Sequence, residues 1–304
     1  MIKILATDGM DKSAVEALKK AGCQVDSVFY EPEPLKEAVK DYDVLVVRSA
    51  TKVRAVHIDA AKETGRLQLI IRAGVGVDNI DVGYAEERGI CVKNTPLSSS
   101  DAVAELALAH MFSVARFISA AGYTMREGKW EKKAYKGIEL AGKTVGIVGY
   151  GRIGQALGRR CQALGMMVLA YDIFQVPELV CDTMRYVEMD ELLSRADIIS
   201  LHVPSLPGQP VVNEESLLKM KDGVILINTS RGTNVDEAAL LAALDSGKVY
   251  GAGLDVFAEE PAKNAALYCH PRVSSTPHVG ASTAEAQKRI GEEIVDIITK
   301  QFSF

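Results

Sequence analysis

Short apolar runs alternate with longer amphipathic segments through the first third of the chain. Short apolar runs of this kind are typical of strands in a parallel sheet whose two faces are both covered. The amphipathic segments at Asp11–Ala21 and Pro34–Lys40 have the spacing of surface helices. The pattern predicts βα units that feed a parallel sheet. Its predicted strands are Ile2–Ala6, Val44–Val47, Leu69–Ile71 and Ile90–Val92.

This pattern is interrupted at Asn94–Ser100 (NTPLSSS), and a longer apolar-periodic segment then predicts one helix from Asp101 to about Ala121, with Asp101 as its N-cap. After the polar segment Glu127–Glu139 a second series of βα units begins, and Ser282–Thr299 closes the chain as an amphipathic helix. The six strands predicted for this second series are Thr144–Val148, Val168–Tyr171, Ile198–Leu201, Val224–Asn228, Gly253–Val256 and Val273–Ser275. The fold class is therefore α/β, with two doubly wound parallel-sheet domains that join near residue 97. Ligands of such sheets bind beyond the carboxyl ends of the strands, so we expect the site in a cleft between the domains.

Composition removes several classes of function. The chain has 304 residues, a formal net charge of −5 and 48% hydrophobic residues, which is typical of a globular protein. The negative net charge gives no sign of a basic surface for nucleic acid. No apolar run approaches the roughly 18 residues of a membrane span, so a membrane partner is not expected either. No signal peptide is visible, which favours a cytoplasmic protein. The five cysteines are odd in number and form no CxxC pair, so neither disulfides nor a metal site is expected.

The segment GYGRIG carries the glycine spacing of a dinucleotide-binding turn. Gly149 permits the tight turn, Gly151 lets the backbone approach a pyrophosphate, and Gly154 lets strand and helix pack closely. Asp172 ends the next predicted strand, where a carboxylate accepts hydrogen bonds from ribose hydroxyls and repels a 2′-phosphate. No Arg or Lys stands between Asp172 and Thr183. The motif predicts a Rossmann domain that binds NAD in preference to NADP.

Three later loops carry residues suited to hydride-transfer chemistry. Arg231 follows one strand and can bind a carboxylate bidentately, and Glu260 and His278 follow the next two. Reduction of a carbonyl requires a proton donor, and histidine titrates near neutral pH. A neighbouring carboxylate favours the protonated imidazole. Each residue taken singly also fits an ordinary loop position, and spacing does not show that the three meet.

In this order, GYGRIG with Asp172, NTSRG, LDVFAEEP and TPHVGAST resemble the D-isomer-specific 2-hydroxyacid dehydrogenases over nearly the whole chain. The stretches VVRSATKV and IRAGVGVDNID, together with GKWEKKAYKGIELAGKTVGIVG, are similar to the catalytic portion of the D-3-phosphoglycerate dehydrogenases in that family. The resemblance implies a substrate-binding domain of residues 1–97 and 282–304, and an NAD-binding domain of residues 98–281.

The resemblance also implies roles for individual residues. Arg231, Glu260 and His278 match the catalytic residues, and Asp255 matches the aspartate that holds the nicotinamide carboxamide. The remaining cofactor residues implied are Arg152 and Ile153 at the pyrophosphate, and Val203, Pro204, Thr229 and Gly280 on loops that line the cofactor. Those implied for the substrate carboxylate or phosphate are Arg48, Ser49, Arg72, Gly74, Val75 and Gly76. The chain departs from the family pattern at Val75, where a polar residue is common, and in the loop SLPGQPVV.

The implied reaction is the NAD-dependent oxidation of D-3-phosphoglycerate to 3-phosphohydroxypyruvate, the first step of L-serine biosynthesis. Lys132 or Lys133 of a partner subunit is a further candidate for the phosphate. We expect a homodimer, formed through the long helix and the segment around Trp130, although ordinary core packing would account for the same apolar residues. Two alternatives stay open. One is a glyoxylate or hydroxypyruvate reductase, or another D-2-hydroxyacid dehydrogenase, and the other is an NAD(H)-sensing protein related to the family's corepressors.

Overall fold

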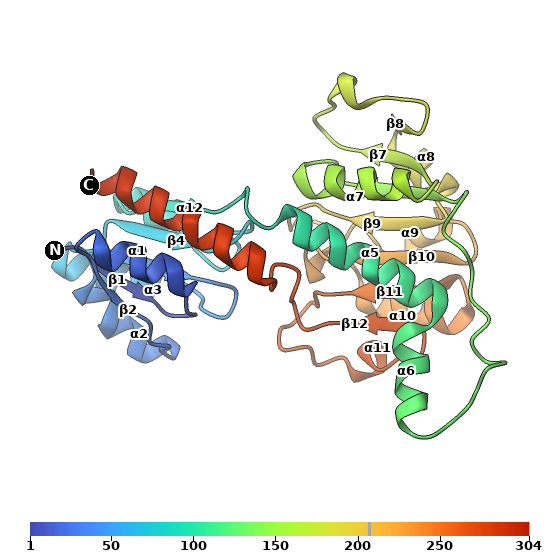
Figure 1. Ribbon diagram of the computed structural model, residues 1–304, viewed down its shortest axis with the longest axis horizontal. Helices are drawn as coiled ribbons and strands as arrows, with labels where there is room; N and C mark the ends of the chain where they lie inside the picture. The colour runs from blue at the N-terminus through green and yellow to red at the C-terminus, as the bar shows by residue number, and fades with distance from the viewer. Residues whose placement is uncertain (206–207, 304) are drawn as a thin grey trace. The chain divides into compact units, whose positions relative to one another are not determined.

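The computed structural model describes residues 1–205 and 208–303, and the chain divides into two compact units (Figure 1). Unit 1 comprises Met1–Ser99 and Ala281–Phe304, and unit 2 comprises Ser100–Gly280. Of the loop SLPGQPVV, Leu206 and Pro207 lie outside the described residues, as does Phe304 at the end of the chain. Each unit is a parallel sheet with helices on both faces, which confirms the predicted α/β class.

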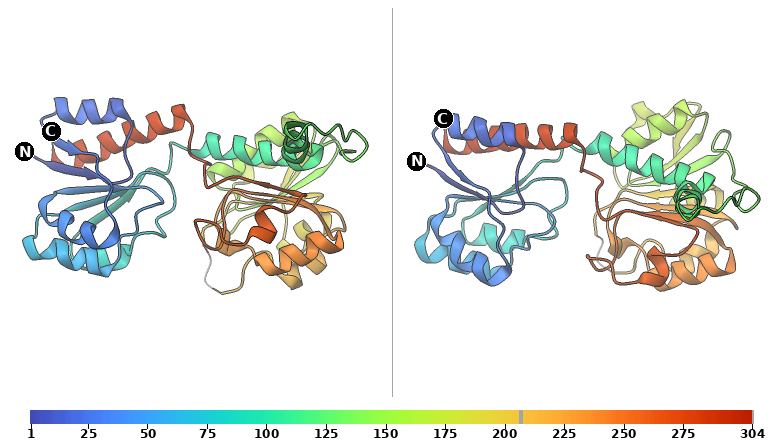
Figure 2. Two further views of the ribbon diagram at one scale, coloured as in Figure 1. Left: turned by 90° about the horizontal axis from the view of Figure 1, so that it is seen from below. Right: turned by 60° about the horizontal axis from the view of Figure 1, so that its bottom comes forward.

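Unit 1 is built on a five-stranded parallel sheet in the order β2-β1-β3-β4-β5. Its strands are β1 Lys3–Ala6, β2 Gln24–Asp26, β3 Val44–Val47, β4 Leu69–Arg72 and β5 Cys91–Asn94. Its helices are α1 Lys12–Lys20, α2 Pro32–Ala38, the short 3₁₀ helix η1 Val39–Asp41, α3 Ala55–Thr64, α4 Val82–Glu87 and α12 Ala284–Phe302. Helices α1 and α12 cover one face, and α2, α3 and α4 cover the other (Figure 2). The strand β3 is buried along its whole length, which explains its unbroken run of Val and Leu.

Unit 2 is built on a seven-stranded parallel sheet in the order β12-β11-β10-β9-β6-β7-β8. Its strands are β6 Thr144–Val148, β7 Met167–Tyr171, β8 Met184–Tyr186, β9 Ile198–Leu201, β10 Val224–Asn228, β11 Val249–Leu254 and β12 Val273–Ser275. Its helices are α5 Ser100–Arg116, α6 Ile118–Arg126, α7 Arg152–Ala163, α8 Met189–Arg195, α9 Glu214–Lys219, α10 Glu237–Ser246 and α11 Ala265–Tyr268, with the 3₁₀ helices η2 Pro177–Leu179 and η3 Gly232–Asn234. The strand order reverses between β6 and β9. In sheets of this type, ligands bind beyond the carboxyl ends of the strands at such a point.

The single helix predicted over Asp101–Ala121 was wrong. The chain instead forms α5 and α6, which are separated by Phe117 in the left-handed conformation at φ 55° and bend by 66°. The Phe117 ring packs against Tyr135 and Tyr250, with ring centroids 5.9 and 5.8 Å away, so a tertiary contact accompanies the break. Asp101 is not the N-cap either, because the helix already includes Ser100.

The sequence did not reveal two edge strands, and the bounds it predicted for one inner strand were wrong. The edge strands β2 and β8 are three residues long and each has one buried residue, so their apolar signal is weak. The strand predicted at Gly253–Val256 is observed as β11, which begins four residues earlier and ends at Leu254. Gly251 and Gly253 conceal this strand in the sequence, because glycine lowers its apparent β-propensity.

In the described part of the chain no single helix is long and apolar enough to cross a membrane; α5 and α6 pass such a test only as a bent pair, and α5 buries its apolar side within unit 2. All five cysteines are free thiols. Cys161 lies in the core between α7 and the sheet, where burial raises its pKa to about 12 and leaves the thiol unreactive.

Candidate functional site

The turn between β6 and α7 has the geometry of a phosphate-binding loop. Gly149 adopts φ 91°, and a Cβ there would lie 2.5 Å from the carbonyl oxygen of His202 on the neighbouring strand connection. A Cβ on Gly154 would lie 2.2 Å from the Gly149 oxygen, so helix and turn touch backbone to backbone. At Gly151 the space is open, and among the described residues no side chain caps α7 there. The first N–H groups of α7 are therefore available to an anion.

Asp172 and Thr229 extend this loop into a dinucleotide site. Asp172 stands directly after β7 and accepts a 2.6 Å hydrogen bond from the Tyr150 N–H, which ties the carboxylate to the glycine turn. Thr229 follows β10, and its buried hydroxyl has no hydrogen-bond partner in the described part of the chain. A buried hydroxyl of this kind is explained by a ligand or water that completes it. The donors, the open glycine and the carboxylate fit the pyrophosphate and ribose of NAD.

Arg231 is carried by a turn that Asn228, the last residue of β10, holds in shape. The buried Asn228 amide donates to the Arg231 carbonyl at 2.8 Å and accepts from the N–H and the hydroxyl of Ser230. The next residue, Gly232, packs so closely on the Phe257 backbone that a Cβ would lie 1.9 Å from it. This contact joins the Arg231 turn to the loop that bears Glu260.

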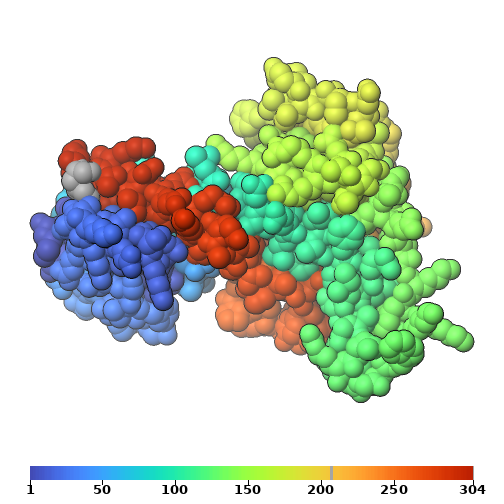
Figure 3. Space-filling model, in the orientation of Figure 1, coloured from blue at the N-terminus to red at the C-terminus, as the bar shows by residue number. Residues whose placement is uncertain are grey.

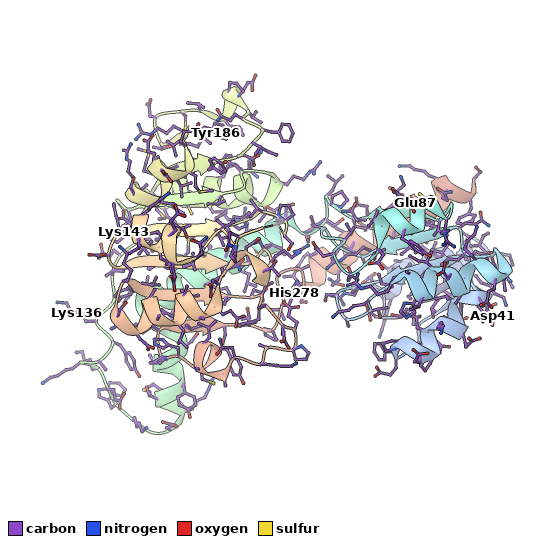
Figure 4. The ribbon with its side chains drawn as sticks, turned by 180° about the vertical axis from the view of Figure 1, so that it is seen from behind. Asp41, Glu87, Lys136, Lys143, Tyr186 and His278 are labelled. Atoms are coloured by element: carbon purple, nitrogen blue, oxygen red, sulfur yellow. The ribbon has the colours of Figure 1, made fainter. Side chains whose placement is uncertain are left out.

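Glu260 and His278 form a hydrogen-bonded pair. His278 lies on the loop after β12 (Figure 4), and its Nδ1 is 2.7 Å from Glu260 Oε2. Its backbone adopts φ 54°, an uncommon conformation for a residue with a side chain, and its N–H donates to the Asp255 carbonyl. Burial alone would raise the pKa of Glu260. The hydrogen bond from His278, with the charges of His278 and Arg231, outweighs burial and lowers that pKa, so Glu260 is a carboxylate at neutral pH.

Asp255 is a buried carboxylate at the carboxyl end of β11. Oδ1 accepts hydrogen bonds from the Thr276 hydroxyl at 2.6 Å and the Val279 N–H at 2.8 Å, and Oδ2 accepts from the Gly280 N–H at 2.8 Å. Because β10, β11 and β12 are parallel neighbours, their carboxyl ends lie along one edge of the sheet. The structure therefore brings Arg231, Glu260 and His278 together at that edge.

The other residues that the resemblance implied for the cofactor surround the glycine turn and the same sheet edge. Arg152 is exposed at the start of α7, and Ile153 is half-buried beside it. After β9, the Val203 carbonyl accepts a 3.0 Å hydrogen bond from Asn234, and Pro204 is exposed.

In unit 1 the predicted substrate residues lie at the ends of two neighbouring strands. Arg48 follows β3, and Arg72 ends β4 in register with Val47. The Arg48 N–H donates to Asp8 at 2.6 Å, and Asn79 donates to the Arg48 carbonyl at 2.7 Å, so this loop is held from both sides. Ser49 and Val75 are exposed and Gly76 is half-buried.

Gly74 makes room for the side chain of Arg72. A Cβ on Gly74 would overlap the Arg72 guanidinium, and Gly74 adopts φ 147°. Arg72 Nη1 donates to the carbonyl of Ala73 at 3.2 Å. The guanidinium thus folds back over the glycine turn.

Within each unit, sequence reasoning missed several polar residues that hold the predicted site residues in place. Asp8 and Asn79 fix the Arg48 loop, and Asn228 fixes the Arg231 turn. Thr276 and the buried His110 extend the hydrogen bonds of Asp255 into the protein. Asn228 is marked in the sequence by its place at the end of a long apolar run. His110 is marked only as a single histidine in an apolar helix.

Comparison with known proteins places the chain in a family. The model of the D-isomer specific 2-hydroxyacid dehydrogenase NAD-binding domain matches residues 108–280. A hydroxypyruvate reductase of Thermotoga maritima is 48% identical, and the match covers 98% of both chains. A D-3-phosphoglycerate dehydrogenase of Methanocaldococcus jannaschii is 44% identical over 99% of this chain, which spans 57% of that protein.

Solved structures with the same fold carry related chemistry. A glyoxylate reductase from Paecilomyes thermophila superimposes with a TM-score of 0.87 at 31% identity, covering 98% of this chain and 94% of that one. A D-lactate dehydrogenase from Aquifex aeolicus, complexed with NAD and lactic acid, has a TM-score of 0.85 at 31% identity, with 99% and 95% covered. The chain therefore belongs to the D-isomer specific 2-hydroxyacid dehydrogenases and is an NAD-dependent oxidoreductase of that family.

Proposed function

We propose that the substrate pair is D-3-phosphoglycerate and 3-phosphohydroxypyruvate. The observation that carries this proposal is the pair Arg48 and Arg72 at the ends of adjacent strands in unit 1. A 2-hydroxy acid needs one guanidinium for its carboxylate, which Arg231 supplies, and the N–H groups of the turn Gly74–Gly76 are suited to the same kind of group. Two further arginines match the additional charge of a phosphate. The similarity to the M. jannaschii enzyme supports the same assignment.

Arg231, Glu260 and His278 act together on C2 of this substrate. Glu260 holds Nδ1 of His278, which leaves Nε2 to exchange a proton with the substrate oxygen. In reduction the imidazolium protonates the oxygen of the keto group, and in oxidation the neutral imidazole removes the hydroxyl proton. Arg231 polarises the C2–oxygen bond and binds the carboxylate. Glu260 stabilises the charged imidazole.

NAD would supply the redox chemistry of this site, as the carrier of the hydride that passes to or from C2 of the substrate. Asp172 accepts hydrogen bonds from the adenosine ribose, while Gly151, Arg152 and Ile153 present backbone N–H groups to the pyrophosphate. Asp255 accepts from the nicotinamide carboxamide. The loop residues Ser49, Val75, Val203, Pro204, Thr229 and Gly280 complete the binding surfaces for substrate and cofactor.

Glu260→Gln tests the carboxylate's effect on the proton donor. Reduction requires the imidazolium, so its rate falls on the alkaline side as that proton is lost. The lowered pKa of Glu260 keeps a negative charge beside His278 through this range. Without the charge, the protonated imidazole loses its stabilising partner, and the alkaline limb of keto-acid reduction moves to lower pH. Steady-state rates from pH 5 to 9 measure the shift. Glu260→Asp keeps the charge and should move the limb less, and an unchanged profile in Glu260→Gln would refute the assignment.

Hydroxypyruvate reduction is the second candidate. The T. maritima hydroxypyruvate reductase matches nearly end to end, whereas the phosphoglycerate dehydrogenases match over about half of their length. Arg48 and Arg72 would then bind the carboxylate of an unphosphorylated keto acid. Arg231, Glu260 and His278 would perform the same chemistry.

Arg48→Met separates these two substrates. If Arg48 binds the phosphate, the variant raises KM for 3-phosphohydroxypyruvate by about 10- to 100-fold, because a charge-assisted hydrogen bond is lost. KM for hydroxypyruvate changes little. Initial-rate kinetics with both keto acids and NADH measure this, with Arg54→Met as a matched control, because Arg54 is paired with Asp81. A wild-type enzyme with higher kcat/KM for hydroxypyruvate, and equal losses for both substrates in Arg48→Met, would favour the second candidate.

The apolar surface of α6 supports a homodimer. Ile118, Tyr123 and Met125 on this helix are 56%, 61% and 53% exposed, and Trp130 in the segment that follows is 79% exposed. Figure 3 shows α5, α6 and this segment together on one face of unit 2. Large apolar side chains that stay exposed in one segment are typical of a protein–protein interface.

We expect twice the chain mass in light scattering at micromolar concentration. Tyr123→Glu with Trp130→Glu should shift the protein toward the single-chain mass, because buried charges oppose association. A single-chain mass for the unmodified protein would refute the dimer. Lys132 or Lys133 of a partner subunit stays a candidate for the phosphate.

A further inference from the structure

His110 lies at the centre of a chain of hydrogen bonds that leads from the surface of unit 2 to Asp255. The imidazole is 2% exposed, and its Nε2 is 3.0 Å from the Thr276 hydroxyl, which donates to Asp255 Oδ1 at 2.6 Å. Its Nδ1 is 3.0 Å from the hydroxyl of Ser274. Ser274 in turn contacts Ser119, and Ser119 contacts Ser113 at the junction of α5 and α6.

The single proton of the Thr276 hydroxyl determines which atoms in this series of hydrogen bonds donate and which accept. The Thr276 hydroxyl has a single proton and gives it to the Asp255 carboxylate, so its oxygen accepts from His110. Nε2 of His110 is therefore protonated. Burial lowers the pKa of His110, against the opposing effect of the Asp255 charge, so the ring is neutral at pH 7 and Nδ1 accepts from Ser274. Only this tautomer satisfies every member of the chain.

The sequence makes room for His110 at some cost to β11. A Cβ on Gly253 would lie 2.5 Å from the His110 Cβ, and a Cβ on Gly251 would lie 2.7 Å from a side-chain carbon of Val114. These two glycines let α5 approach the strand that ends at Asp255. Glycine inside a strand is destabilising, and it often marks a place where another element approaches closely. Here the element that approaches closely presents a buried imidazole.

We propose that His110 is a positioning residue for the nicotinamide half of the cofactor site. Through Thr276 it fixes the rotamer of the Asp255 carboxylate and the start of the loop that carries His278, whose N–H donates to the Asp255 carbonyl. His110 touches neither substrate nor cofactor. The inference rests on the proposed role of Asp255 toward the carboxamide, and it adds the residue that holds Asp255 in place.

The first test compares NADH with ADP-ribose, which lacks the nicotinamide, by fluorescence titration and calorimetry. His110→Asn and Thr276→Val should weaken NADH binding about tenfold, as expected for the loss of one well-placed hydrogen bond. Both variants should leave ADP-ribose binding unchanged. His110→Gln should restore NADH binding, because its amide reaches the position of Nε2 whereas that of Asn does not. The double variant should bind NADH no more weakly than either single variant, since both remove the same interaction.

Several results would overturn the inference. If Thr276→Val bound NADH as tightly as the unmodified protein, the inference would be wrong. This test remains valid even if His110→Asn fails to fold. Equal losses for NADH and ADP-ribose would mean that His110 only stabilises the unit. Ser113→Ala, at the outer end of the chain, is the matched control and should bind both ligands normally. If the unmodified protein bound neither ligand, the proposed cofactor site itself would fail, which is a separate result.

The second test reads the tautomer directly. In protein labelled with ¹⁵N-histidine, the ring nitrogens of His110 should show a protonated Nε2 and a bare Nδ1 at pH 7, with and without NADH. Thr276→Val should change these shifts. A charged ring, or a proton on Nδ1, would contradict the donors and acceptors assigned along this series of hydrogen bonds.

Discussion

His278→Ala should lower keto-acid reduction by about 10²- to 10⁴-fold, the usual contribution of a positioned general acid. The reason is geometric: Glu260 holds Nδ1 at 2.7 Å, and Nε2 is the ring atom left for the substrate. Alanine leaves a half-exposed gap and removes the proton donor. NADH should still bind, because the glycine turn and Asp172 lie on other loops.

The measurement pairs stopped-flow rates with NADH titration for the same variant. His278→Gln is the control for loss of bulk, and it should be nearly as slow as alanine because an amide cannot donate a proton in this pH range. Turnover within tenfold of the unmodified protein would remove His278 from the reaction. Binding of NADH without any turnover by the unmodified protein would favour the cofactor-sensing alternative.

Arg231→Gln should have the second largest effect, with kcat reduced by about 10²- to 10³-fold, as when one donor to a developing oxyanion is lost. KM for the keto acid should rise as well, since the same guanidinium binds the carboxylate. The effect should be local, because Asn228 holds this turn through the Arg231 backbone, which the variant keeps, and the guanidinium's 2.6 Å hydrogen bond to the Ser230 carbonyl lies within the same turn. The melting temperature should therefore change little.

Arg231→Lys is the matched control. Lysine keeps the charge but not the planar fork, so it should restore part of the binding and little of kcat. A Gln variant with unchanged kcat/KM would show that another group polarises the carbonyl. A Lys variant with full activity would show that charge alone suffices.

Strands buried on both faces were predictable to the residue. Val44–Val47, Ile198–Leu201 and Val224–Asn228 are unbroken apolar runs because helices cover both sides of each sheet. The edge strands β2 and β8 bury one residue each, so local composition carries little of their pairing energy. The break at Phe117 has no glycine or proline to mark it, and ring packing from distant segments accompanies it.

The residues of the candidate site were likewise predictable only in part from the sequence. Motifs identified Arg231, Glu260 and His278, and the parallel strand order explains why their loops share one edge of the sheet. The residues that hold them could not be predicted, because their partners are remote in sequence. His110 and Thr276 are 166 positions apart, and Asp8 and Arg48 are 40 apart. Such pairs are defined by packing, which a single sequence does not encode in any local pattern.

Transfer of an isotopic label shows whether this protein catalyses stereospecific hydride transfer between NAD and C2 of a 2-hydroxy acid. The protein is incubated with 3-phosphohydroxypyruvate, and separately with hydroxypyruvate, together with NADH deuterated at C4 on either face. The product is analysed by mass spectrometry and chiral chromatography. We predict one deuterium at C2 of the D-hydroxy acid, from one face of NADH only, and none in His278→Ala over the same time. Product of L configuration, or a C2 hydrogen that comes from solvent, would contradict the account.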